Sequence, residues 1–383
     1  MNMNKNNSDN QNKKLKVGLI GAGFMGKAHS IAWHALPAVF PQGVEIICEA
    51  ISAVTPKETD KACAELDFKR GINDWRDLVN DPDIDIIDIC SPNFLHKEMI
   101  LAAIHAGKKA IYCEKPLSLN PQDSLEIANL AQTHNVISMT GFNYAKNPVC
   151  SLAKEIIQNG EIGKIYHFRG THCEDYLLDA RAHHSWRLVK ATGGSGALGD
   201  LCHIIHMAMH LVDDIEAVCG NIQTVIPERA DLQGVMQIVE NEDQAHALIK
   251  FKNGTIGTLE FSRVAAGRKM GLTYEINGEL GSIYFDQSRM SELQLYTNTD
   301  ASNRQGFRTI LAGPEHPDYG GFCVASGHGL GFNDMKVVEV RDFVDAILNQ
   351  TRARPDFRDA YKVDCIIAAI IESSNEKRWI ELG

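Results

Sequence analysis

One segment near the middle of the chain carries the side chains best suited to moving protons. The glycine-rich loop Gly193–Gly199 is followed by Asp200 and then by His203, His206 and His210. At about 100° per residue, these four side chains lie on one side of a single helix that continues past His210. The stripe suits proton transfer or metal binding, and a buried helix with hydrogen-bonded histidines is the structural alternative. We favour proton transfer and predict no metal, because no second ligand cluster accompanies the stripe.

Two further polar segments follow apolar runs that are typical of buried strands. Glu114–Pro116 follows Ala110–Cys113, and Ser91–His96 follows Ile84–Cys90. Ligands bind at the carboxyl edge of doubly wound sheets, so Lys115 is predicted to project into a crevice beside a nicotinamide. The structural alternatives are a solvated surface lysine and, for the other segment, a helix start capped by its asparagine.

A glycine pattern near the start of the chain predicts a dinucleotide site. It lies between the predicted strand Lys16–Ile20 and a predicted helix that begins at Phe24 and ends at Ala35. Backbone N–H groups at such a helix N-terminus hold a pyrophosphate. The predicted contacts of this G-x-G-x-x-G loop are Gly21, Gly23, Phe24, Met25 and Gly26.

The choice between NAD and NADP depends on where the second predicted strand ends. An acidic residue at that end binds the ribose hydroxyls and repels a 2′-phosphate. If the strand ends at Cys48, the position is Glu49 and NAD follows; if it runs on to Val54, the position is Ala53. Three neighbours are then able to accept a phosphate, namely Ser52, Thr55 and Lys57. The sequence leaves both alternatives open.

These segments need two kinds of scaffold. Strands alternate with helices through residues 15–143, which predicts an α/β Rossmann domain with a doubly wound parallel sheet. Residues 144–383 are predicted to form an α+β domain with a large open, mostly antiparallel sheet, because hairpin signals such as Asn253-Gly254 separate its strands. Residues 1–14 are predicted to be a disordered tail.

Composition excludes several classes of protein. The net charge is −11 with no Lys/Arg-rich run, so we expect no nucleic-acid partner. No stretch approaches the ~18 apolar residues of a membrane span, and the polar first residues do not resemble a signal sequence. The ten cysteines form no C-x-x-C pair, which favours reduced core thiols in the cytoplasm.

Taken together, Gly21–Gly26, Glu114–Pro116 and Gly193–Asp200 resemble the Gfo/Idh/MocA (glucose-fructose oxidoreductase/inositol dehydrogenase) family, and the likeness covers nearly the whole chain after Lys16. Finer motifs resemble its levoglucosan dehydrogenase-like branch. They are Phe24–Ser30, Asp74–Arg76, Phe142–Tyr144, Ser185–Arg187, Gly306–Thr309 and Gly313–Pro317.

The resemblance implies an NAD(P)-dependent dehydrogenase that acts on a secondary hydroxyl of a sugar, anhydrosugar or cyclitol, in homo-oligomers (dimers or tetramers) assembled through the open sheet. Lys115 would bind the reacting hydroxyl, Asp200 would position substrate and lysine, and a histidine would take the proton. Further implied cofactor contacts are Ser91, Asn93, His96, Glu114, Lys115, Trp186 and Arg187. Implied substrate contacts are Lys115, Asn143, Tyr144, Asp200, His203 and His206.

One departure from the family pattern concerns the base. The family has His four positions after the aspartate and usually Asp three further on, whereas this chain has Asp200, His203 and His206. His203 matches the family histidine best, so we take it as the base with His206 in reserve. Two alternative functions remain, a dinucleotide-binding sensor or regulator without turnover and an NAD-dependent glycosidase, and net redox change separates both from a dehydrogenase.

Overall fold

The computed structural model describes residues 13–383, so the predicted tail lies almost wholly outside the described residues. The chain divides into two compact units. The first holds the chain through Ser118 together with residues 122–143 and 331–361, and the second holds residues 119–121, 144–330 and 362–383. Residues 331–361 therefore belong to the first unit, whereas the sequence predicts one continuous second domain over 144–383.

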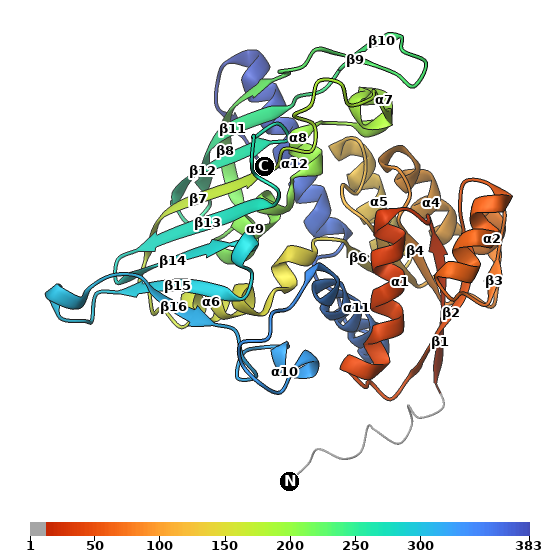
Figure 1. Cartoon of the computed structure of the whole chain (residues 1–383), viewed down its shortest axis with the longest axis horizontal. Helices are drawn as coiled ribbons and strands as arrows, with labels where there is room; N and C mark the ends of the chain where they lie inside the picture. The colour runs from red at the N-terminus through yellow and green to blue at the C-terminus, as the bar shows by residue number, and fades with distance from the viewer. Residues whose placement is uncertain (1–12) are drawn as a thin grey trace. The chain divides into compact units, whose positions relative to one another are not determined.

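The first unit is built on a six-stranded parallel sheet with the order β3-β2-β1-β4-β5-β6 (Figure 1). This is the strand order of dinucleotide-binding folds, so the predicted Rossmann sheet is confirmed. The strands are β1 (Lys14–Ile20), β2 (Glu45–Ser52), β3 (Arg70–Gly71), β4 (Ile86–Ile89), β5 (Ala110–Cys113) and β6 (Ile137–Thr140). Lys14, assigned to the tail from sequence, is the first residue of β1 because it pairs with Glu45.

Helices follow the strands of this sheet. They are α1 (Phe24–Val39), α2 (Pro56–Glu65), α3 (Trp75–Asn80), α4 (Asn93–His105), α5 (Pro121–Thr133) and α11 (Phe332–Asn349). All four residues of β4 and of β5 are buried, as expected for central parallel strands with both faces covered. Figure 1 shows α11 side by side with α1, against which it packs.

Buried charges explain why α11 belongs to this unit. Lys336, which is fully buried, donates to Glu114 Oε1 at 2.5 Å and to Glu339 Oε2 at 2.9 Å. Tyr112 donates to the same Glu339 carboxylate. Burial alone would lower the pKa of Lys336, but attraction to the two carboxylates outweighs it and raises that pKa. Lys336 is therefore held as a cation inside the unit.

A second part of the same network comes from α1. The His29 ring lies between Asp88 Oδ1 (2.8 Å from Nδ1) and Glu114 Oε1 (2.9 Å from Nε2), and all three side chains are buried. Trp33 Nε1 also donates to Asp88, at 2.7 Å. Burial lowers the pKa of His29, yet the Asp88 charge and the bonds to both carboxylates raise it overall. Helices α1 and α11 are thus joined through the carboxylates of Asp88, on β4, and of Glu114, directly after β5.

The second unit contains a nine-stranded sheet with the order β16-β15-β14-β13-β7-β12-β11-β8-β17. Only its β7–β12 pair is parallel, so the predicted mostly antiparallel sheet is confirmed. The strands are β7 (Ile165–Cys173), β8 (Ile215–Gln223), β11 (Gln244–Phe251), β12 (Ile256–Ser262), β13 (Gly271–Gly278), β14 (Gly281–Asp286), β15 (Glu292–Thr297), β16 (Arg308–Leu311) and β17 (Ile380–Glu381). A short hairpin joins β9 (Glu228–Ala230) to β10 (Met236–Ile238).

Short helices accompany this sheet (Figure 1). They are α6 (Pro148–Gln158), α7 (Lys190–Gly193), α8 (Ala197–Asp200), α9 (His203–Leu211) and α10 (Tyr319–Phe322), and most of α12 (Phe357–Glu376) also belongs here. Side chains of β11 alternate between buried and exposed from Ala245 to Phe251, as expected for a strand with one face toward a core. Among residues 13–383, no helix is both long and apolar enough to span a membrane.

Replacing Lys336 by methionine should lower the free energy of unfolding by about 3–5 kcal/mol, because two buried carboxylates then lose their cation. Lys362→Met is the matched control. Its ion pair with Asp214 joins side chains that are 42% and 33% exposed, so we expect a loss of at most about 1 kcal/mol. Urea denaturation of both variants measures the difference, and equal losses would contradict the structural role of Lys336.

Candidate functional site

The glycine loop between β1 and α1 has the geometry that a pyrophosphate requires. Gly21 has a φ of +104°, and a Cβ there would lie 2.5 Å from the Cys90 carbonyl oxygen. At Gly26 a Cβ would lie 2.0 Å from the Gly21 oxygen, so α1 packs closely on the loop only without a side chain. At Gly23, by contrast, a Cβ would meet no atom within 4 Å, which leaves space for a ligand to approach the backbone. The loop therefore fits a dinucleotide.

The start of α1 is also suited to an anion. No side chain within the described chain caps this helix, and its first turn holds no acidic residue. Its N–H groups can therefore bind phosphate oxygens. Of the predicted contacts here, Phe24 is 75% exposed and its ring stacks on Phe332 at 5.7 Å, while Met25 is half-buried.

His96 connects the two polar segments at the carboxyl edge of the sheet. Its Nδ1 lies 2.8 Å from the Pro116 carbonyl oxygen and its Nε2 lies 3.0 Å from that of Ser91. The ring is fully buried, and burial lowers its pKa. His96 thus positions both loops. Asn93 is not the helix cap that the structural alternative required, because α4 begins after Pro92 and has no side-chain cap.

Glu114 and Lys115 are neighbours with different environments. The Glu114 carboxylate is buried between Lys336 and His29, and its pKa is lowered because these cations and their bonds outweigh burial. Lys115, in contrast, is half-buried, and its peptide bond to Pro116 is cis. The buried side chain of Glu114 therefore anchors the segment that carries Lys115.

In the second unit, Asp200 is held by two residues that the sequence analysis missed. Tyr176 donates its hydroxyl to Asp200 Oδ2 at 2.5 Å, and Arg263 Nη1 lies 3.7 Å from the same oxygen. Arg263 is fully buried and is itself fixed by Asp243 (3.0 Å) and Asn241 (2.7 Å). Burial and the Asp200 charge raise the pKa of Tyr176 well above its usual value, so its hydroxyl keeps its proton and donates.

The glycine-rich loop determines where Asp200 lies. A Cβ at Gly196 would come within 2.0 Å of the Glu242 carbonyl oxygen and 3.0 Å of the Arg263 guanidinium carbon. The loop is bonded to the same segment, since Ala197 N donates to that carbonyl at 2.8 Å and Leu198 N donates to the Glu242 carboxylate at 3.0 Å. Only a glycine allows this close approach, which brings α8 and its last residue beside Arg263.

The prediction of one continuous helix through Asp200 and the histidines is wrong. Asp200 ends α8, a turn follows at Leu201 and Cys202, and His203 begins α9. The spacing of about 100° per residue therefore does not relate the aspartate to the histidines. It still applies within α9, where His206 and His210 have stacked rings 5.8 Å apart.

The two candidate bases differ in their surroundings. The buried His203 ring contacts Tyr144 edge-on at 4.5 Å and lies 5.7 Å from the His172 ring. Burial lowers the pKa of His206 well below its usual value, and the nearby His210, Lys146 and Lys154 lower it further. His206 is consequently neutral and a weak base.

The remaining predicted residues occupy separate places. Asn143 is buried in the first unit, at the start of the short 3₁₀ helix η1 (Asn143–Lys146). In the second unit, Trp186 and Arg187 lie in η2 (Trp186–Leu188), where the Arg187 guanidinium stacks on the Trp186 ring at 4.3 Å. An exposed, stacked guanidinium is available to a ligand.

Two other features of the first unit lie outside the predicted site. A ring nitrogen of His29, a carboxylate oxygen of Asp88 and the Cys90 sulfur lie within 4.8 Å of one another, a spacing that a metal could use. Both ring nitrogens of His29 already make hydrogen bonds, however, and burial raises the pKa of the Cys90 thiol. We therefore assign this group to the buried charge network.

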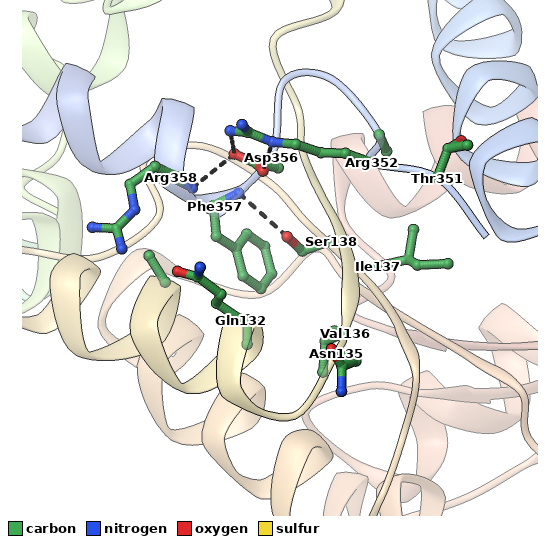
Figure 2. A pocket seen from close by; sticks show the side chains of 13 residues that line it. Gln132, Asn135, Val136, Ile137, Ser138, Thr351, Arg352, Asp356, Phe357 and Arg358 are labelled. Atoms are coloured by element: carbon green, nitrogen blue, oxygen red, sulfur yellow. Dashed lines mark hydrogen bonds and ion pairs between the residues drawn. The ribbon is translucent and has the colours of Figure 1, made fainter.

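A pocket of about 360 Å³ lies where α5 and β6 meet residues 351–358. Figure 2 shows Phe357 N directed to Ser138 Oγ, at 3.4 Å, and the Arg352 side chain bonded to Asp356. None of the predicted site residues lines this pocket. The bond from Phe357 N to Ser138 attaches residues 351–358 to β6.

The sequence of this chain matches a known protein family in both of its parts. Residues 15–142 match the family described as "Oxidoreductase family, NAD-binding Rossmann fold", and residues 151–284 match the GFO/IDH/MocA C-terminal domain. Levoglucosan dehydrogenase of Pseudarthrobacter phenanthrenivorans is 39% identical over 97% of this chain and 98% of its own length. Myo-inositol 2-dehydrogenase of Thermotoga maritima is 27% identical over 77% of this chain and 81% of its own.

Solved structures agree with the sequence comparison. A levoglucosan dehydrogenase in complex with NADH and levoglucosan is 40% identical, with a TM-score of 0.94 over 96% of this chain and 99% of that one. An NAD-binding oxidoreductase from Klebsiella pneumoniae is 39% identical, with a TM-score of 0.92 over 97% and 99%. Matches of this extent in both parts of the chain show that it belongs to the GFO/IDH/MocA family of oxidoreductases.

Proposed function

We propose that the protein is an NAD(P)-dependent dehydrogenase that transfers hydride between nicotinamide and a secondary hydroxyl of a sugar, anhydrosugar or cyclitol. The observation that carries the proposal is its similarity, over nearly the whole chain, to a levoglucosan dehydrogenase, together with Lys115 and Asp200 at the matching motif positions. The bound nicotinamide supplies the hydride acceptor or donor. Everything else that the reaction needs is assigned to side chains of this chain.

Binding and positioning use the features of the first unit. The N–H groups at the start of α1 bind the pyrophosphate, and Ser91, Asn93 and the backbone near Glu114 complete the cofactor site. His96 keeps the two loops at a fixed separation. Lys115 donates a hydrogen bond to the reacting hydroxyl and stabilises the negative charge that develops on its oxygen.

Proton transfer is assigned to the second unit. An alcohol has a pKa far above 7, so it cannot give up hydride unless its proton also leaves, and a neutral imidazole accepts that proton. We assign this base to His203, which matches the family histidine best, whereas burial and the nearby Lys146 and Lys154 lower the pKa of His206. Asp200 accepts a substrate hydrogen bond, and Tyr176 and Arg263 fix the direction of its carboxylate.

The first test is a change in nicotinamide absorbance with NAD and then NADP against levoglucosan, inositols and hexoses. A signal with any of these substrates supports the dehydrogenase. Cleavage of a glycoside without net change in the cofactor would instead establish the glycosidase. Dinucleotide binding with no turnover on the whole panel would favour the sensor, and either result overturns the proposal.

Asn substitutions separate the two histidines. His203→Asn should lower kcat by roughly a hundredfold or more, because it removes the proton acceptor. His206→Asn should lower it less than tenfold, since a neutral, weak base is replaced by a neutral amide. Steady-state kinetics measures both, and NADH binding by each variant is the control for folding. A normal His203→Asn beside an inactive His206→Asn would move the base to His206.

We also propose a cytoplasmic homo-oligomer, a dimer or tetramer assembled through the exposed face of the nine-stranded sheet. Leu248 on β11 is 52% exposed and Ile256 on the neighbouring β12 is 58% exposed, so that face offers apolar side chains among polar ones. None of the ten cysteines, all of which lie among the described residues, is in a disulfide, which supports a reducing compartment.

Leu248→Glu should therefore shift the protein toward monomers, because it places a charge within the buried interface. Sedimentation velocity measures the shift. Val324→Glu is the control, since Val324 is 90% exposed and lies outside the sheet. A wild-type monomer at micromolar concentration, or an unchanged oligomer in Leu248→Glu, would contradict this interface.

A further inference from the structure

The structure decides where β2 ends, which the sequence left open. β2 continues to Ser52, which pairs with Ile20, and the Ser52 carbonyl oxygen accepts a hydrogen bond from Gly21 N at 2.8 Å. The strand therefore ends beside the first glycine of the phosphate loop. In dinucleotide-binding folds, the residue at this point faces the adenosine ribose. Here that residue is Ala53, which offers only a methyl group.

Glu49, the alternative ribose ligand, is engaged elsewhere. It lies three residues before the end of β2, or about 10 Å along an extended strand. The pairing of β1 with β2 skips it, since Val17 pairs with Cys48 and Gly18 pairs with Ala50. Its carboxylate is bonded to Arg70 Nε at 3.1 Å and lies 3.4 Å from Lys69 Nζ. Glu49 therefore binds Arg70, the first residue of β3, and Lys69, the residue before it.

The next acidic side chain after the strand is also committed. Glu58 Oε2 accepts from Thr55 N at 3.1 Å and from Thr55 Oγ1 at 2.9 Å, while Thr55 Oγ1 accepts from Glu58 N. This reciprocal pair caps α2 and holds the carboxylate against its first turn. Lys57, between them and exposed, brings a positive charge to the same turn.

We propose that the adenosine end of the site accepts a 2′-phosphate, so that the protein binds NADP(H) and NAD(H) with dissociation constants within about tenfold of each other. Discrimination against NADP(H) in this fold depends on a carboxylate at the end of the second strand. Ala53 removes that repulsion, and neither Glu49 nor Glu58 replaces it. The inference rests on the proposed dinucleotide site, and the experiment below separates the two.

The test is titration of the substrate-free protein with NADH and with NADPH, followed by nicotinamide fluorescence. The wild type should bind both within about tenfold. Ala53→Asp should weaken NADPH at least tenfold while NADH binding is kept or improved, because the new carboxylate accepts the ribose hydroxyls and repels the phosphate. Ala53→Asn, which has the same size without the charge, should leave the NADPH dissociation constant within about threefold of the wild type.

Each contrary result has one meaning. Wild-type NADPH binding more than a hundredfold weaker than NADH binding would overturn the inference and leave the proposed function intact. Equal weakening of NADPH by the Asp and Asn variants would also overturn it, because size and not charge would then set the preference. Failure of the wild type to bind either dinucleotide would instead overturn the proposed function itself.

Discussion

The contact between Lys336 and Glu114 is the constraint on which the first unit depends. Two oppositely charged groups lose their hydration when they are buried, and only a close, fully bonded arrangement compensates for that loss. Here the arrangement includes His29 and Asp88, so it joins α1, β4, β5 and α11. Glu114 directly precedes Lys115, so the segment proposed to contact substrate is attached to this buried charge network.

Local patterns in the sequence predicted much of this fold. The alternation of apolar runs and helical segments predicted the parallel sheet, and the glycine spacing predicted the phosphate loop. Both predictions were possible because the residues that form each pattern are close together in the sequence. The role of α11 was not predicted, because Lys336 and Glu114 are 222 positions apart in the sequence. A single lysine within a helical segment is usually interpreted as a solvent-exposed residue. Tyr176 and Arg263 were not predicted either, being far in sequence from the aspartate they hold.

The break between Asp200 and His203 shows a different limit. No proline or glycine occurs at Leu201 or Cys202, so the segment reads as helical throughout. Tertiary contacts of the Gly196 loop with Glu242 fix α8, and the chain then turns before α9. A shortened aspartate-to-histidine spacing is accommodated by this turn. The register shift between β1 and β2 that leaves Glu49 unpaired with β1 could not be predicted either. The hydrogen-bond register between two strands does not follow from the amino-acid composition of either strand.

The return of residues 331–361 to the first unit also constrains synthesis. When residue 143 leaves the ribosome, the last partner of Glu114 is still 193 residues away, which at a rate of about 5–20 residues per second corresponds to roughly 10–40 s. During that interval Glu114 in the nascent Rossmann sheet has His29 as a partner but lacks Lys336. The buried charge network of the first unit is therefore completed only after most of the second unit has been translated.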